Sequence, residues 1–141
     1  MVQKNSPTCV VLIPFEKKPN EATILQSMYD HIIKPEVVQA GFRAIRTDEV
    51  SPEFRFIDQI RLAIKESAVV IADLSGNNPN IMYEIGLAHA LGKPVILIST
   101  DVALAPFDLL GSRMLLYDPN RTDDFRKKLK TFLSRYAHEK A

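Results

Sequence analysis

The sequence predicts a single α/β domain built on a five-stranded parallel sheet, and three observations support this prediction. Short apolar segments alternate with longer segments of helical periodicity, as in βαβ units. One apolar segment, residues 68–74 (AVVIADL), is continuous, which is typical of a strand covered by helices on both faces. A length of 141 residues with 46% hydrophobic residues suits one globular domain, residues 1–141, with its own core.

The first half of the chain is predicted to contain two strands and two helices. Residues 8–14 (TCVVLIP) form the first strand, and apolar residues at helical spacing follow it. Pro35 interrupts this helix or begins its second part, because proline lacks an N–H donor and clashes with the preceding turn. Gly41 ends the helix, residues 42–47 (FRAIRT) alternate as a second strand, and residues 54–67 return to helical spacing.

The second half is predicted to contain three strands and two helices. The strands are residues 68–74, 94–99 (PVILIS) and 113–117 (RMLLY), and the helices are residues 79–91 and 122–137. Since strands that alternate with helices cross over right-handedly into parallel sheets, five strands predict a flavodoxin-like, Rossmann-like three-layer sandwich of strand order 2-1-3-4-5. Ligands of such sheets bind beyond the carboxyl ends of the strands, near the point where the strand order reverses.

Charge, cysteine content and hydropathy exclude several classes of protein. Eighteen basic and 17 acidic residues give a net charge of +1, so no overall field attracts a nucleic-acid polymer or a membrane surface. The single cysteine, Cys9, cannot form an internal disulfide and is expected to be a buried, inert thiol in a reducing compartment. Without a signal-peptide pattern or an apolar run of membrane-helix length, a cytoplasmic protein is predicted. No cluster of histidines or cysteines suggests a metal site, and no cofactor is expected.

The loops at the carboxyl ends of the first three strands form the predicted ligand site. They are residues 15–20, 48–52 and 75–80. The third loop (SGNNPN) places Asn78 as an N-cap before Pro79, so a helix begins there with N–H groups able to hold a phosphate or carboxylate. The simpler interpretation is that these residues only form a turn and cap the helix. The chain has neither a GxGxxG nor a GxxxxGK[ST] phosphate-binding pattern. The candidate substrate-binding residues of this loop are Ser75, Gly76, Asn78 and Asn80.

The helix after this loop carries a carboxylate, Glu84, in an otherwise apolar setting. Asn80 and Tyr83 can share with Glu84 the end of the helix that faces the loop. Gly86 and Ala90 are expected to form a smooth face for packing on the sheet. One role for Glu84 is to stabilise the helix dipole, which contributes about 0.3–1 kcal/mol at an exposed position. The other interpretation is that Glu84 is a partly buried, functional carboxylate, because its neighbours leave little solvated face on the helix.

The segment ADLSGNNPNIMYEIGLAHALGKPVILI, residues 72–98, resembles the nucleoside 2-deoxyribosyltransferase superfamily and its relatives, the 2'-deoxynucleoside 5'-phosphate N-hydrolases. Outside it, three shorter segments resemble a TIR-like, nucleotide-binding branch of the same superfamily: IPF, IIKPEVVQAGF and RTDEV. Together these segments span most of the chain, and the central motif is quite specific.

The resemblance implies that Glu84 is the nucleophile that attacks the anomeric carbon of a nucleoside or nucleotide and displaces the base. In the transferases, an aspartate six residues before the nucleophile contacts the sugar or assists proton transfer to the base. Here that position is Asn78, which can hold a hydroxyl but cannot act as a general acid. Asp73 is a second catalytic candidate for the acidic role, with capping of the strand-to-helix loop as the alternative.

The resemblance thus implies an enzyme that cleaves an N-glycosidic bond, either by hydrolysis or by deoxyribosyl transfer. The alternative, which Asn78 favours, is a non-catalytic nucleotide-binding module or TIR-like sensor. The partner in both cases is a small nucleotide or nucleoside. Its base, its sugar, the need for a 5'-phosphate and the suitability of NAD stay open.

Three further positions and one basic run are weaker candidates. Phe15 could stack on a base, with a place in the core or over a turn as the alternative. Asp48 could bind ribose hydroxyls or simply be solvated. His89 lies five residues past Glu84 and is expected to point elsewhere on the helix. The basic run at residues 126–128 is interpreted as surface charge.

The helix at residues 79–91 is apolar almost all round, which predicts that its outer face is covered. A second subunit would cover it in a homodimer or larger homo-oligomer, and the resemblance implies sites completed by a neighbouring chain. The alternative is that the C-terminal helix of the same chain covers this surface.

Overall fold

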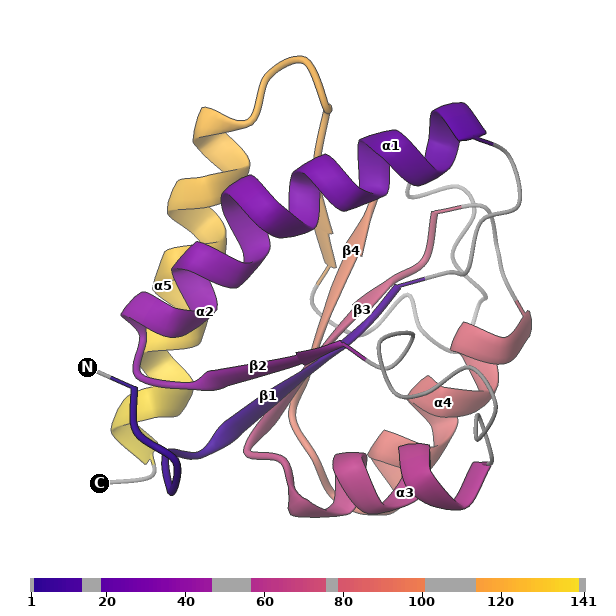
Figure 1. Cartoon of the computed structure of the whole chain (residues 1–141), viewed down its shortest axis with the longest axis vertical. Helices are drawn as coiled ribbons and strands as arrows, with labels where there is room; N and C mark the ends of the chain where they lie inside the picture. The colour runs from indigo at the N-terminus through magenta and orange to yellow at the C-terminus, as the bar shows by residue number, and fades with distance from the viewer. Residues whose placement is uncertain (1, 14–18, 47–56, 76–78, 101–113, 140–141) are drawn as a thin grey trace.

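The computed structural model describes residues 2–13, 19–46, 57–75, 79–100 and 114–139, and it confirms the predicted α/β fold. Five strands pair in parallel in the predicted order β2-β1-β3-β4-β5, with helices on both faces of the sheet (Figure 1). The strands are β1 (Thr8–Leu12), β2 (Arg43–Arg46), β3 (Val69–Asp73), β4 (Val95–Ser99) and β5 (Met114–Leu116). The helices are α1 (Pro19–Met28), the π-helix η1 (Tyr29–Ile33), α2 (Lys34–Gln39), α3 (Ile57–Glu66), α4 (Pro79–Ala90) and α5 (Asp123–Glu139).

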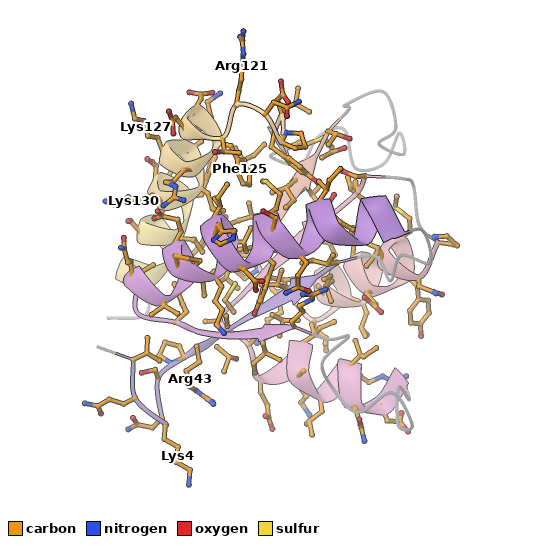
Figure 2. All side chains as sticks on the ribbon, turned by 45° about the horizontal axis from the view of Figure 1, so that its top comes forward. Lys4, Arg43, Arg121, Phe125, Lys127 and Lys130 are labelled. Atoms are coloured by element: carbon orange, nitrogen blue, oxygen red, sulfur yellow. The ribbon has the colours of Figure 1, made fainter. Side chains whose placement is uncertain are left out.

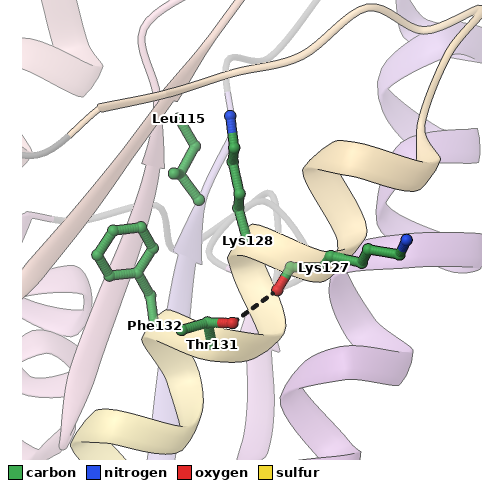
Figure 3. A pocket seen from close by; sticks show the side chains of 5 residues that line it. All are labelled: Leu115, Lys127, Lys128, Thr131 and Phe132. Atoms are coloured by element: carbon green, nitrogen blue, oxygen red, sulfur yellow. Dashed lines mark hydrogen bonds between the residues drawn. The ribbon is translucent and has the colours of Figure 1, made fainter.

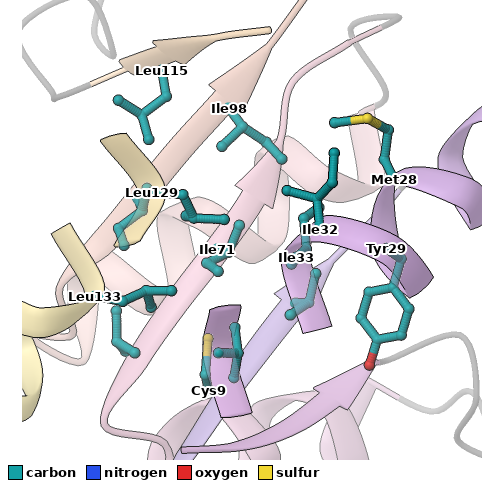
Figure 4. Packing of buried hydrophobic residues seen from close by; sticks show 14 of the residues in the cluster. Cys9, Met28, Tyr29, Ile32, Ile33, Ile71, Ile98, Leu115, Leu129 and Leu133 are labelled. Carbon is teal, nitrogen blue, oxygen red and sulfur yellow. The ribbon is translucent and has the colours of Figure 1, made fainter. Parts of the chain in front are cut away.

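The two faces of the sheet carry separate cores, because successive side chains of a strand point to opposite faces. On one face, Cys9, Val11 and Ile71 pack with residues of η1, α2 and α5 (Figure 4). On the other face, Val10 and Val70 pack with residues of α3 and α4. This two-sided cover explains why β3 is a continuous apolar run. Since α4 and α5 lie on opposite faces, the alternative in which the C-terminal helix covers α4 is wrong.

The single thiol lies inside the sheet. Cys9 is completely buried in β1, as predicted, and this burial raises the pKa of its thiol. Because the thiolate is the reactive form of cysteine, the folded chain protects Cys9 from thiol reagents.

The helical segment around Pro35 continues but changes its winding. α1 runs directly into η1, whose backbone hydrogen bonds reach one residue further than in an α-helix, and α2 follows. Pro35 has no N–H to offer to the carbonyl four residues before it, that of His31. Arg126 of α5 donates to this carbonyl at 2.6 Å, and the same guanidinium lies 3.6 Å from Oε1 of the buried Glu36. Arg126 is thus a surface charge, with its side chain 43% exposed, that also donates to a backbone carbonyl and pairs with a buried carboxylate.

Two helices end at glycines in the left-handed region of backbone conformation. Gly41 has a φ of 97° after α2, as expected for the predicted helix end, and Gly92 has a φ of 72° after α4. Glycine adopts this conformation without steric cost. Among the described residues, no helix has both the length and the apolar character needed to cross a membrane.

Candidate active site

The candidate site lies at the carboxyl end of β3, where the chain passes into α4. Asp73 is the last residue of β3, and Ser75 follows it closely. Asn80 is exposed in the first turn of α4, and Glu84 lies in the second turn. The remaining predicted residues, except Tyr83, fall outside the described part of the chain: Phe15, Asp48, Gly76 and Asn78.

Glu84 lies on the side of α4 that packs against the sheet. Its residue exposure is 6%, and its neighbours on that side, Ile81, Ile85 and Ala88, belong to the core shared with α3. The sequence-based expectation of a buried carboxylate in an apolar helix is therefore confirmed. Tyr83 differs, because it is 56% exposed and lies on the outer part of the helix.

Asp73 is buried and accepts hydrogen bonds through both carboxylate oxygens. The phenol of Tyr117 donates to Oδ2 at 2.7 Å, and the Ser75 N–H donates to Oδ1 at 2.8 Å. Ser75 Oγ lies 3.2 Å from the Tyr117 oxygen and accepts from the Thr100 N–H at 3.1 Å. Burial raises the pKa of Asp73 above its usual value, although these hydrogen bonds oppose the shift. Burial, followed by the nearby charge of Asp73, also raises the pKa of Tyr117. Together these residues tie the ends of β3, β4 and β5.

Asp73 and Glu84 lie on opposite faces of the sheet. The side chain of Asp73 lies on the same face of the sheet as those of the residues two and four positions before it, which belong to the core on the α5 side. Its partner Tyr117 packs on Phe125 of α5, with ring centroids 5.3 Å apart. α4, which carries Glu84, covers the other face. The structure therefore places Asp73 beside Tyr117, away from the face that carries Glu84.

Tyr117 is a residue of this cluster that sequence reasoning missed. It is 44 positions from Asp73 in the chain, so no local spacing connects the two. One signal was available, because Tyr117 ends the last predicted strand and parallel strands end at one edge of the sheet. Only the strand order brings β5 within one strand of β3.

The Asp73 carboxyl predicts a specific dependence of stability on pH. Because folding raises its pKa, its contribution to stability is fully present below its usual pKa of 3.8 and is lost as pH rises through the folded value. The variant Asp73→Asn does not titrate there. We expect the free energy of unfolding of the wild type, minus that of Asp73→Asn, to fall as pH rises from about 3.5. Denaturant unfolding at a series of pH values measures this difference, and a constant difference would contradict the prediction.

Comparisons with known proteins identify the fold. No protein-family model matches the chain, and no curated protein matches it. Solved structures do match, among them the CMP N-glycosidase of Clostridium botulinum, with 22% identity, a TM-score of 0.59, and coverage of 89% of this chain and 99% of that one. The chain has the fold of nucleoside 2-deoxyribosyltransferases and N-glycosidases.

Two transferases support the same conclusion. The 2-deoxyribosyltransferase of Bacillus psychrosaccharolyticus is 16% identical at a TM-score of 0.55, with 80% of this chain and 88% of that one covered. The 2-deoxyribosyltransferase of Leishmania mexicana is 20% identical at a TM-score of 0.54, with 67% of this chain covered. The chain spans 65% of the length of the Leishmania protein. The resemblance inferred from the central motif is thus confirmed at the level of the fold.

In this deoxyribosyltransferase-like fold, the outer face of α4 is open and partly apolar. Gly86 and Ala90 are exposed on it, so the prediction that they pack on the sheet is wrong. A Cβ atom added at Gly86 would meet no atom within 4 Å. Tyr83 and Leu91 also contribute exposed apolar surface. His89 is exposed, as expected for a residue that points elsewhere on the helix.

Two cavities of the described residues lie on the other face of the sheet. One, of about 440 Å³, lies between β5 and α5 and is lined by Leu115, Lys127, Lys128, Thr131 and Phe132 (Figure 3). The second, of about 300 Å³, lies between α2 and α5. Neither is lined by a predicted site residue. In the part of the chain that the structure describes, no group of three or more His, Cys, Asp or Glu side chains could hold a metal ion.

Proposed function

We propose that the protein cleaves the N-glycosidic bond of a nucleotide or nucleoside, with Glu84 as the nucleophile. The observation that carries this proposal is the burial of Glu84 on the sheet side of α4, in the helix that begins just after β3. Ligands of parallel sheets bind at this edge. The fold shared with an N-glycosidase and two deoxyribosyltransferases supports the same chemistry.

In the proposed reaction, a carboxylate oxygen of Glu84 attacks the anomeric carbon while the bond from that carbon to the base nitrogen breaks. The base leaves with the electron pair of this bond and takes a proton from water. Water then attacks the anomeric carbon of the glycosyl ester, which releases the sugar, a proton and the Glu84 carboxylate. Low solvent exposure strengthens the attraction between this carboxylate and the positive charge that develops on the sugar.

A nucleoside monophosphate is the substrate class that we propose. The chain covers 99% of the structure named as a CMP N-glycosidase, which supports a substrate of this kind. Asn78, six residues before Glu84, can bind a sugar hydroxyl but cannot donate a proton as an acid, so we propose hydrolysis in preference to transfer. The other substrate contacts that we propose are Phe15, Asp48, Ser75, Gly76, Asn80 and Tyr83.

A panel of substrates tests the proposal. The purified chain is incubated with CMP and other ribonucleoside monophosphates, deoxynucleoside monophosphates, nucleosides and NAD, and free base is measured by chromatography. We expect base release from at least one monophosphate, with slower release from the matching nucleoside. Stoichiometric binding of a nucleotide without release would instead support the non-catalytic sensor, which Asn78 also fits. Release from no compound on the panel would exclude the proposed activity for these substrates.

We also propose that two copies of the chain associate through the outer face of α4. Tyr83 is 56% exposed and Leu91 is 38% exposed on or beside this face. Gly86 and Ala90 lie between them in the sequence and leave room for close approach of another helix. An exposed apolar surface of this kind is typical of an interface between subunits.

The variant Gly86→Arg tests this association. We expect light scattering to give at least twice the chain mass of 15.9 kDa for the wild type and a single-chain mass for Gly86→Arg. The variant should keep its circular dichroism, because space is open around Gly86 in the single chain. Gln59→Arg, at an exposed position of α3, is the control and should stay associated. A single-chain mass for the wild type would contradict the proposal.

A further inference from the structure

A hydrogen-bonded cluster joins Ser75, one of the proposed substrate contacts, to Asp73, Thr100 and Tyr117, which have no role in the reaction proposed above. Its members come from the ends of three neighbouring strands, β3, β4 and β5. We propose that Tyr117 and Asp73 are positioning residues: they hold Ser75, and with it the start of the β3–α4 connection, where the Glu84 reaction requires it. This inference rests on the proposed function.

Ser75 is held through both its backbone and its side chain. Its N–H donates to Asp73 Oδ1 at 2.8 Å, which fixes the direction in which the chain leaves β3. Its Oγ lies 3.2 Å from the Tyr117 oxygen and 3.1 Å from the Thr100 N–H donor, which fixes its side chain. Such a network leaves Ser75 little conformational freedom.

Asp73 is suited to positioning because both its oxygens already accept hydrogen bonds within the protein. It is 2% exposed and faces the α5 side of the sheet. Glu84 lies on the face that α4 covers. A direct proton transfer from Asp73 to the leaving base would require it to give up these partners, so we infer that it acts through Ser75.

Tyr117 is a rigid support for Asp73. It is 5% exposed, and its N–H donates to the Ser99 carbonyl at 3.0 Å. Its ring packs on Phe125 at a centroid distance of 5.3 Å. Because both the backbone and the ring are held, the phenol oxygen has a fixed place from which to donate to Asp73, as residues that support an active site require.

The variant Tyr117→Phe tests the inference in the full chain. It keeps the ring and the contact with Phe125 but removes the phenol oxygen that contacts Asp73 and Ser75. We expect kcat on the preferred monophosphate to fall about 10- to 100-fold, with a smaller change in KM, because a small misplacement of the site lowers turnover. Tyr136→Phe, which removes a partly buried phenol of α5, is the control and should leave kcat unchanged.

If Tyr117 only stabilises the fold, the expected result is different. Tyr117→Phe would then lower Tm but leave kcat per folded molecule unchanged, and this result would overturn the inference. The double variant Asp73→Asn with Tyr117→Phe adds a second criterion. If the two residues act as a unit, the double variant is no less active than the less active of the two single variants. Losses of activity that multiply in the double variant would contradict the pairing.

Amide hydrogen exchange separates this inference from the proposed function. We expect the Ser75 amide to exchange about tenfold faster in Tyr117→Phe than in the wild type, with no change in Tyr136→Phe. If the wild type releases no base from any substrate, the proposed function fails, yet this measurement still decides whether Tyr117 holds Ser75. Unchanged exchange at Ser75 would overturn the inference, whether or not the chain is an enzyme.

Discussion

Glu84→Gln is expected to abolish base release and to leave the fold intact. The amide has nearly the shape of the carboxylate but no negative charge, so it is a poor nucleophile toward the anomeric carbon. We expect kcat to fall about 10³-fold or more, the scale seen when a covalent nucleophile is removed. Because Glu84 is 6% exposed in an apolar surrounding, removal of its charge should not destabilise the chain through lost solvation. Free base by chromatography and Tm measure the two effects.

Two further variants make this test specific to Glu84. Glu66→Gln removes an exposed carboxylate at the end of α3 and should retain full turnover. Glu84→Asp keeps the charge but withdraws it by one methylene, so it should retain more activity than Glu84→Gln. Turnover that Glu84→Gln leaves unchanged would refute the assignment of the nucleophile.

Arg126→Ala is expected to cause the largest loss of stability among the substitutions discussed. It removes the donor to the His31 carbonyl and the cation 3.6 Å from Glu36, whose side chain is 5% exposed. An acceptor left without its partner and a buried carboxylate left without its cation together cost about 2–3 kcal/mol, less than for a fully buried pair because Arg126 is 43% exposed. Tm should fall by roughly 6–12 °C in a thermal unfolding scan.

The neighbouring residue provides the control for Arg126. Lys127 projects outward from α5 (Figure 2), and Lys127→Ala should change Tm by much less. Arg126→Lys should be intermediate, because an ammonium group lacks the planar fork that serves His31 and Glu36 together. Equal Tm values for Arg126→Ala and Lys127→Ala would show that the guanidinium does not stabilise the chain.

The strands and most helices are predictable because their burial follows their periodicity. β3 is buried at all five positions, so its apolar run is uninterrupted in the sequence. The π-helix η1 is not predictable in this way. An α-helix and a π-helix differ in which carbonyl each N–H reaches, and the apolar residues Tyr29, Ile32 and Ile33 suit either winding.

The side of α4 that faces the sheet is less predictable than the helix itself. Because this helix is apolar almost all round, composition does not distinguish its inner side from its outer side. Gly86 and Ala90 have the spacing of a packing face, yet the bulkier Ile81 and Ile85 fill the space against the sheet. Larger side chains bury more apolar area there.

The candidate site also has one feature that the sequence predicts and one that it does not. The burial of Glu84 follows from its immediate neighbours, so a short segment suffices to predict it. The contact between Asp73 and Tyr117 depends on the order of strands and on side-chain direction at the end of β3. From the sequence alone, a carboxylate at a strand end therefore indicates equally well a ligand-binding residue or a residue that bonds to another part of the protein. Only the order of the strands in the sheet distinguishes the two.

The complete burial of Cys9 gives the chain a built-in reporter of unfolding. The sequence contains no tryptophan, so tryptophan fluorescence cannot report unfolding, but it contains one thiol. β1 is paired on both edges, with β2 and β3, and both of its faces are covered, so a thiol-reactive dye reaches Cys9 only after the sheet opens. The labelling rate then reports the population of open chains. Every substitution proposed here can be ranked for stability by this labelling reaction, without a cysteine or tryptophan having to be introduced.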